Sequence, residues 1–235
     1  MKTLRKSEWV ILVGLLVYSF IPTFGGLFRV LELAGGPTIA PDNPRATAMP
    51  FPIVLHILCS FLFCLLGALQ FLPSLRRNHP RAHRIMGRMV AVAGCLSAGS
   101  GVWMAHFYSF PTSLQGNMLY GARMILGCLM IAFILRSVLA IRARNVFRHS
   151  AFMLRAYAIA QGASTQTFLG MGWMILHGEQ ATGIPRDVLM VFAWGINLLV
   201  AEVLIWAVLA PKRLPTAHVP PQAMARRSTH SGSLM

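Results

Sequence analysis

The amino-acid sequence predicts an all-α integral membrane protein, a bundle of six transmembrane helices with both termini in the cytoplasm. Hydrophobic residues make up 56% of the 235 residues and charged residues only 11%, whereas soluble domains average about 45–50% and about 25%. The apolar residues form six stretches of about 20 residues or more, long enough to cross a bilayer as helices. The basic residues concentrate in alternate connections between these stretches.

The six stretches are nearly continuous in apolar residues, and none alternates polar and apolar residues as a barrel strand would. A bilayer cannot hydrogen-bond a bare backbone, so helices are expected. The predicted spans are residues 9–33, 50–72, 86–107, 118–141, 150–176 and 187–210. Residues 1–210 are therefore expected to form a single transmembrane domain.

The first stretch resembles a signal peptide only in its basic start, Lys2, Arg5 and Lys6. Its apolar part is longer than the 7–15 or so residues of a signal-peptide core, and no convincing cleavage site follows it. We expect it to remain as the first span.

Lysine and arginine lie almost entirely on one side of this six-span arrangement. The N-terminus, the second and fourth connections and the C-terminal region carry fifteen, whereas the other side carries two, Arg45 and Arg186. Because cytoplasmic loops are enriched in basic residues, both termini are predicted to be cytoplasmic, with anionic lipids as partners at that face. This placement also argues against nucleic-acid binding, since the net charge of +15 belongs to no folded soluble face.

Two further features are read from composition. Residues 211–235 are rich in Pro, Ser and basic residues without apolar periodicity, which predicts a disordered basic cytoplasmic tail. The four cysteines all lie within predicted spans and lack CxxC spacing, so neither a disulfide nor a redox motif is expected.

Ionisable residues inside the predicted spans are the first pointers to function, because each costs about 2.5–3.5 kcal/mol at a span centre. They are Arg29, Glu32, Arg123, Arg136, Arg155 and Glu202. Two carboxylates cannot neutralise four guanidiniums, which leaves lipid phosphates or the anionic groups of a cofactor or substrate as further partners. For Arg155 three readings stay open: pairing with Glu202, a ligand anion such as a haem propionate, or snorkelling to lipid.

The histidines are the second pointer. His83 and His149 lie at matched depth near the cytoplasmic face on different helices, as a bis-histidine haem b requires. His56 is a candidate ligand toward the outer side, with His106 or His177 as partner. Ordinary interfacial histidines are the alternative reading. His79 and His83 also have the i, i+4 spacing of metal ligands, but no Cys or carboxylate neighbour completes a set.

Two spans have unusual polar or small residues. In the third span Ala93, Ser97 and Gly101 recur every four residues, which favours close helix packing and would also admit a flat macrocycle. The fifth span carries amides and hydroxyls from Gln161 to Thr167 near the membrane centre. Hydrogen bonding between helices is the expected use, and a polar cavity for a quinone headgroup or a proton path is the alternative.

Three sequence blocks support a family resemblance. They are His56 with Gly67-Ala68-Leu69-Gln70-Phe71, then His83-Arg84-Ile85-Met86-Gly87-Arg88, and His149 with Phe152-Met153-Leu154-Arg155-Ala156-Tyr157-Ala158. Together, over roughly residues 50–169, they resemble a family of predicted bacterial membrane proteins catalogued as domain of unknown function 2306. The resemblance implies a bacterial membrane location and a helical fold, and no reaction.

A fainter likeness is to the cytochrome b561 group of six-helix membrane electron carriers. It implies one haem between His83 and His149, and a second between spans two and four. The fourth span has no histidine, so His56 lacks the partner that this likeness implies.

The resulting hypothesis is a multi-pass inner-membrane protein with haem-b or quinone-linked electron transfer, and with a quinone or a redox protein as partner. A small-molecule transporter and a ligand-free structural or assembly protein are the alternatives. The candidate cofactor-binding residues are His83, His149, His56, Arg155 and Arg123, with His83 and His149 as the ligands of a haem iron.

Overall fold

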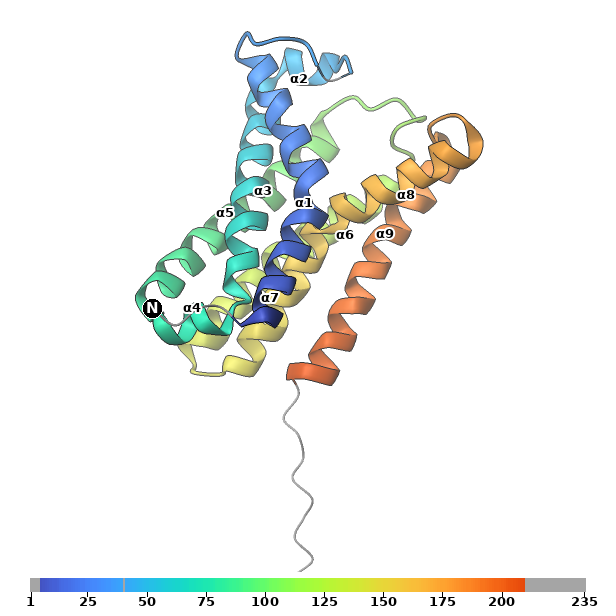
Figure 1. Cartoon of the computed structure of the whole chain (residues 1–235). Helices are drawn as coiled ribbons and strands as arrows, with labels where there is room; N and C mark the ends of the chain where they lie inside the picture. Colours follow the sequence, from blue (N-terminus) through green and yellow to red (C-terminus); the bar gives the residue numbers. More distant parts are fainter. Residues whose placement is uncertain (1–4, 40, 210–235) are drawn as a thin grey trace, which may run out of the picture.

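The computed structural model describes residues 5–39 and 41–209, and every regular element among them is helical (Figure 1). The elements are α1 (Lys6–Leu33), α2 (Pro44–Ala48), α3 (Pro50–Gln70), α4 (Pro73–Asn78), α5 (Pro80–Phe107), α6 (Asn117–Arg142), α7 (Val146–Ala160), α8 (Gly162–His177), α9 (Gly183–Leu204) and the π-helical turn η1 (Ile205–Leu209). The all-α prediction is confirmed for these residues. The predicted tail, 211–235, lies outside them.

Five helices are long and apolar enough to cross a membrane: α1, α3, α5, α6, and α9 continued by η1. The predicted span 150–176 differs, because Gln161 divides it into α7 and α8, which have 15 and 16 residues. One side chain from α9 lies at this interruption. Trp194 Nε1 donates to the carbonyl of Ile159 at 3.1 Å, and its indole lies where a side chain at Gly162 would be. The count of six spans therefore stays a prediction.

Four helices, α1, α5, α7 and α9, also begin three to six residues earlier than predicted. α5 begins at Pro80 rather than at residue 86, because proline is well suited to a first helical turn. His83 therefore lies inside α5 rather than before it. α9 begins at Gly183 rather than at residue 187, which brings Asp187 into its second turn.

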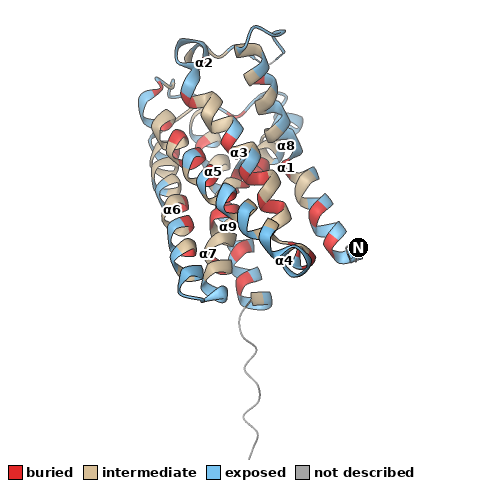
Figure 2. Ribbon diagram, turned by 90° about the vertical axis from the view of Figure 1, so that its left-hand side faces the viewer, coloured by how far each residue is buried: buried red, intermediate tan, exposed pale blue. Residues whose placement is uncertain are grey.

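The helices pack around a core formed mainly by α3, α5, α6 and α7. α3 lies against α5, and α6 lies between α5 and α7, while α1 covers α3 and α8, and α9 covers α7 and α8. The most buried large side chains are Phe63, Val90, Leu119 and Ile134. Figure 2 shows the buried residues along the inner faces of the helices and the exposed ones outside.

The outer faces of the bundle are apolar. Leu176, Ile184 and Trp206 are 81%, 79% and 86% exposed, and large apolar side chains cover most of the outward faces of α1, α6 and α9. Exposing so wide an apolar surface to water is unfavourable. The surface is suited to contact with the lipid tails of a bilayer.

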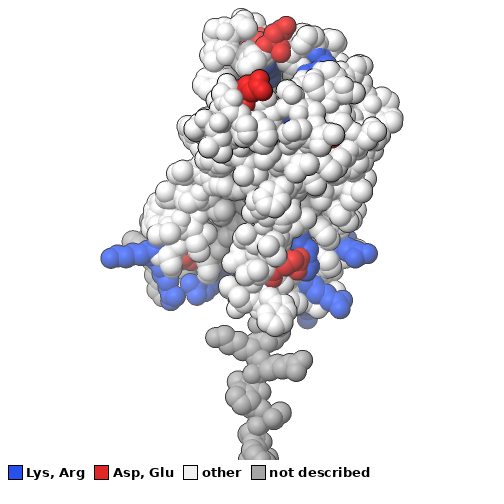
Figure 3. All heavy atoms as spheres, turned by 90° about the vertical axis from the view of Figure 1, so that its right-hand side faces the viewer, with Lys and Arg blue, Asp and Glu red and all other residues white. Residues whose placement is uncertain are grey.

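The two ends of the bundle differ in charge. α1 begins and α9 ends at the same end, where α4 and the starts of α5 and α7 also lie (Figure 1). On the face drawn in Figure 3, lysine and arginine atoms gather at this end. We call it the basic end, and the end that holds α2 and the α5–α6 and α8–α9 connections the opposite end.

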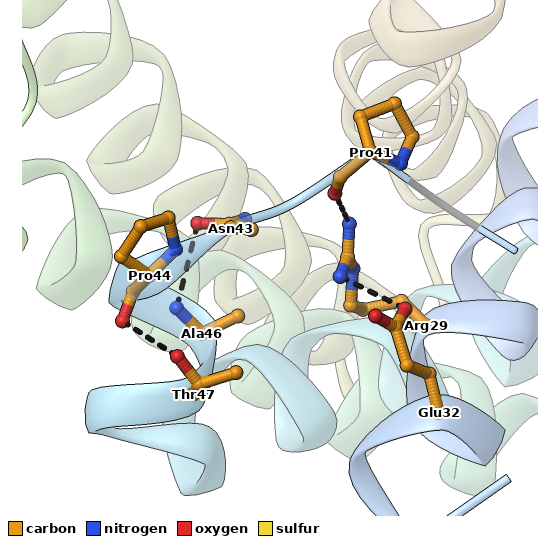
Figure 4. Close-up of polar contacts among 7 residues, drawn as sticks. All are labelled: Arg29, Glu32, Pro41, Asn43, Pro44, Ala46 and Thr47. Atoms are coloured by element: carbon orange, nitrogen blue, oxygen red, sulfur yellow. Dashed lines mark hydrogen bonds and ion pairs between the residues drawn. The ribbon is translucent and has the colours of Figure 1, made fainter. Parts of the chain in front are cut away.

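At the opposite end, an ion pair of α1 contacts the connection between α1 and α3. Arg29 Nη1 lies 2.9 Å from Glu32 Oε2, and Arg29 Nη2 donates to the carbonyl of Pro41 (Figure 4). The Asn43 side chain accepts a hydrogen bond from the Ala46 backbone N–H at the start of α2. Arg29 and Glu32 thus neutralise each other and hold the connection against α1.

Candidate functional site

The starts of α5 and α7 and the end of α3 bring three of the predicted sequence blocks together at the basic end. His83 lies in the first turn of α5, and its Nδ1 is buried with no hydrogen-bond partner among the described residues. Arg76 lies on the short helix α4 just before α5, and His149 lies in the first turn of α7. The two histidines that were predicted to act as a pair therefore lie on different helices, both at the basic end of the bundle (Figure 1).

The ring of His149 is held by Ser137 of α6. Nδ1 of His149 lies 2.7 Å from Ser137 Oγ and 3.2 Å from the Ser137 carbonyl oxygen, and Ser137 Oγ donates to the His149 carbonyl at 3.1 Å. These contacts fix the orientation of the ring through Nδ1. With the ring hydrogen on Nδ1, the Ser137 carbonyl accepts it and Nε2 carries the lone pair of the neutral imidazole.

Gln70, the last residue of α3, completes this group. Its Nε2 is buried and has no partner in the described structure. Its Oε1 lies 3.3 Å from where a Cβ would stand on Gly87, one turn after His83 on α5. Glycine at 87 therefore leaves room for the Gln70 amide. We call Gln70, His83, Ser137 and His149 the histidine cluster.

Tyr157 locks α7 to α3 just inside the histidine cluster. Its ring lies where a side chain at Gly67 would be, packs edge-on against Phe71 with centroids 5.0 Å apart, and its hydroxyl donates to the Cys64 carbonyl at 3.1 Å. No role was predicted for Tyr157 from the sequence. Its position in the sequence block that also contains His149 is the feature that could have pointed to it.

Comparison with known proteins gives the family of the chain. A family model described as predicted membrane protein (DUF2306) matches residues 53–205. The chain belongs to this family. The match starts in α3 and ends at η1, so it includes the whole histidine cluster and extends beyond the predicted limit of residue 169 to take in α9. No curated protein and no solved structure matches the chain.

Arg155 of this DUF2306 protein forms the predicted ion pair with Glu202. Arg155 Nε lies 2.5 Å from Glu202 Oε1 and Nη2 lies 2.8 Å from Oε2, a two-pronged contact between α7 and α9. The guanidinium also lies 5.8 Å from the ring centroid of Phe152. The carboxylate occupies two of the three nitrogens of Arg155.

His56 and Arg123 lie toward the opposite end. Nδ1 of His56 is 2.8 Å from the Ser97 carbonyl oxygen, and its ring is 3.2 Å from where a Cβ would stand on Gly101. The small residues of α5 thus make room for this imidazole. His106 bonds to the hydroxyl of Tyr120, and His177 stacks on Trp173. The structure therefore engages both predicted partners of His56 elsewhere.

The polar residues of the predicted fifth span form a network between helices near the α7–α8 interruption. Its members are Tyr18, Ser19, Gln161, Ser164, Thr165 and Asn197. Gln161 Nε2 donates to Ser19 Oγ at 2.8 Å, and Thr165 Oγ1 donates to Asn197 Oδ1 at 2.8 Å. The expected hydrogen bonding between helices is confirmed, and it joins α1, α8 and α9.

Glu8 is a buried carboxylate that the sequence analysis missed. Only 3% exposed, it accepts hydrogen bonds from the Ser74 backbone N–H at 2.8 Å and the Ser74 hydroxyl at 2.7 Å, at the start of α4. A carboxylate there matches the positive end of a helix. The sequence feature that could have pointed to Glu8 is that it is the one acidic residue in an otherwise basic N-terminal segment. Among the described residues, no group of three or more His, Cys, Asp or Glu could hold a metal ion.

Proposed function

We propose that this DUF2306 protein binds a redox cofactor within the membrane, at the histidine cluster, and that the cofactor is haem b with His83 and His149 as iron ligands. The observation that carries the proposal is that His83 and His149 lie in the first turns of α5 and α7, two different helices that both begin at the basic end. Haem b, when bound, supplies reversible one-electron transfer.

The residues present fit this group in two respects. Ser137 holds the His149 ring at Nδ1, the position through which ligating imidazoles are usually oriented, and these contacts leave Nε2 free. Arg76 lies on α4, directly before α5, and would supply positive charge where an anionic substituent of the cofactor meets the membrane surface.

The visible spectrum of the protein, purified in detergent after expression with added haem, tests this proposal. We expect a low-spin spectrum with an α-band on reduction with dithionite, lost in His83→Ala and in His149→Ala. His79→Ala is the matched control, because His79 is exposed and lies four residues before His83. Wild-type protein without haem, or full haem in both variants, would contradict the proposal.

A second candidate ligand is a quinone headgroup, which the unpartnered nitrogens favour. Gln70 Nε2 and His83 Nδ1 are buried without partners, and a buried amide or imidazole donor is costly unless an acceptor meets it. The carbonyl oxygens of a quinone are such acceptors. If the protein contains no haem, a short-chain quinone analogue should raise its melting temperature, and Gln70→Leu, which removes the amide and with it the donor, should abolish that rise.

One observation supports each of the two remaining hypotheses, a transporter and a ligand-free structural protein. A small-molecule transporter is favoured by the helix interruption at Gln161, since transporters often build sites at discontinuous helices. A ligand-free structural protein is favoured by the dense hydrogen bonding at that point. If the experiments above find neither haem nor a response to the quinone analogue, the transporter and the ligand-free structural protein are the two hypotheses that are left.

We also propose that the protein crosses a bacterial inner membrane six times, with the basic end and both termini in the cytoplasm. The charge difference between the two ends supports this orientation (Figure 3). In this arrangement α7 and α8 together form the fifth crossing, and the histidine cluster faces the anionic lipids of the cytoplasmic leaflet.

A further inference from the structure

Two arginines flank one aromatic ring at the opposite end of the bundle, and a third lies nearby. The guanidinium carbon of Arg45 lies 4.7 Å from the centroid of Phe110, and that of Arg123 lies 5.2 Å from the same centroid. Their guanidinium carbons are therefore at most about 10 Å apart. Arg186 is nearby because it hydrogen-bonds to Leu114, whereas Arg123 hydrogen-bonds to the next residue, Gln115. We call Arg45, Arg123 and Arg186 the arginine cluster.

The carboxylate in this neighbourhood is already engaged. Asp187 is 3% exposed, and its two oxygens accept the backbone N–H groups of Gly116 and Leu119, each at 3.1 Å, at the start of α6. The ion pairs of the described residues are Arg29–Glu32 and Arg155–Glu202, and neither includes the arginine cluster. The cluster thus carries three positive charges, none of them in an ion pair among the described residues, and the nearby Asp187 carboxylate also accepts two backbone N–H groups at a helix start.

The guanidiniums are held in place by neutral groups. Arg123 Nη1 donates to Gln115 Oε1, and the Gln115 amide is fixed in turn by donating to the Ala105 carbonyl at 3.1 Å. Arg186 Nε donates to the Leu114 carbonyl at 3.2 Å. Each side chain keeps further N–H groups, because a guanidinium has five. The cluster is positioned and remains short of negative charge.

We propose that the arginine cluster binds a phosphate group at this end of the bundle. A guanidinium cannot lose its proton in a protein, so the surplus charge has to be met by an anion. The planar N–H fork of arginine matches phosphate oxygens in a two-pronged contact. A lipid headgroup and free phosphate present the same oxygens, and the end of a membrane bundle meets both.

Melting temperatures with each phosphate source test the proposal. One arm adds inorganic phosphate, with sodium chloride at equal ionic strength as reference, to the full-length protein in an uncharged detergent. The other arm compares nanodiscs of phosphatidylglycerol with nanodiscs of phosphatidylcholine. We expect a rise in melting temperature in at least one arm, and an apparent dissociation constant about tenfold weaker in Arg123→Gln and in Arg186→Gln, as loss of one charged contact of roughly 1.4 kcal/mol implies.

Arg142→Gln is the matched control, because Arg142 is exposed and lies at the other end of α6. It should respond as the wild type does. A response in the lipid arm alone identifies a headgroup, and a response in the phosphate arm alone identifies the free anion. If Arg123→Gln does not fold, Arg186→Gln and Arg123→Lys carry the test. No response in either arm, or an equal response in wild type and Arg186→Gln, would overturn the proposal.

Discussion

Single charged residues in this protein are stabilised by particular partners. Arg155 and Glu202 come from α7 and α9 and meet in a two-pronged contact, with side chains 25% and 51% exposed. A surface hollow of about 470 Å³ lies beside Glu202 and is lined by Val203, Trp206 and Ala207. Glu202 lies two residues before the end of α9, at the basic end. The open side of the pair therefore lies near the lipid headgroups, and removal of the pair should cost less than removal of a fully buried one.

We expect Arg155→Gln to lower the free energy of unfolding by about 1–2 kcal/mol, a value reduced from that of buried pairs for partial exposure. It leaves Glu202 charged without a partner. Glu202→Gln added to it should restore much of the loss, because removing both partners costs less than removing one. Melting curves of the wild type, the single variants and the double variant measure this. A double variant no more stable than Arg155→Gln would show that the pair contributes nothing.

At the scale of helices, small residues decide how closely α3, α5 and α6 approach. A Cβ on Gly94 of α5 would lie 2.5 Å from Phe63 Cε2 of α3 and 2.7 Å from Ile134 Cδ1 of α6. Gly99, on the same helix, has nothing within 4 Å of its Cβ position. The stripe of small residues on α5 therefore serves helix packing and makes room for His56.

Gly94→Ala should destabilise the bundle by about 1–3 kcal/mol, since the added methyl group forces Phe63 and Ile134 to move. Gly99→Ala should be neutral or stabilising by up to about 1 kcal/mol, because alanine is the better helix former. Thermal unfolding followed by circular dichroism in detergent separates the two variants. Equal melting temperatures would mean that the contact at Gly94 relaxes without cost.

At the scale of the molecule, the asymmetric charge fixes the orientation that we propose. The basic end holds the start of α1, α4, and the starts of α5 and α7, whereas Arg45, Arg123 and Arg186 lie at the opposite end. The orientation of a membrane protein depends on this difference between the two ends, rather than on the total charge of +15.

Reporter fusions after Met49 and after Arg148 test this orientation. The first position ends the α1–α3 connection, and the second lies at the start of α7. We expect a periplasmic reporter to be active at the first and a cytoplasmic reporter at the second. The same side for both positions would refute the proposed crossings between them.

The sequence predicted much of the fold because hydropathy and charge act locally. The span limits of α3 and α6 agree with the structure to within two residues, since a change from apolar to polar residues ends a membrane helix whatever its neighbours are. The interruption at Gln161 was not predictable, because it depends on the indole of Trp194, which comes from another helix.

The candidate site shows the same division. The sequence by itself predicted that His83 and His149 lie at matched depth, and it left Glu202, a ligand or a lipid as the source of an anion for Arg155. Only the tertiary structure decided that Glu202 supplies this anion, that Ser137 orients His149, and that Gln70 and His83 keep buried nitrogens without partners. Depth follows from position along a helix, which local sequence fixes. Partnership depends on how each helix is rotated about its axis, and that rotation is set by packing against all of its neighbours at once.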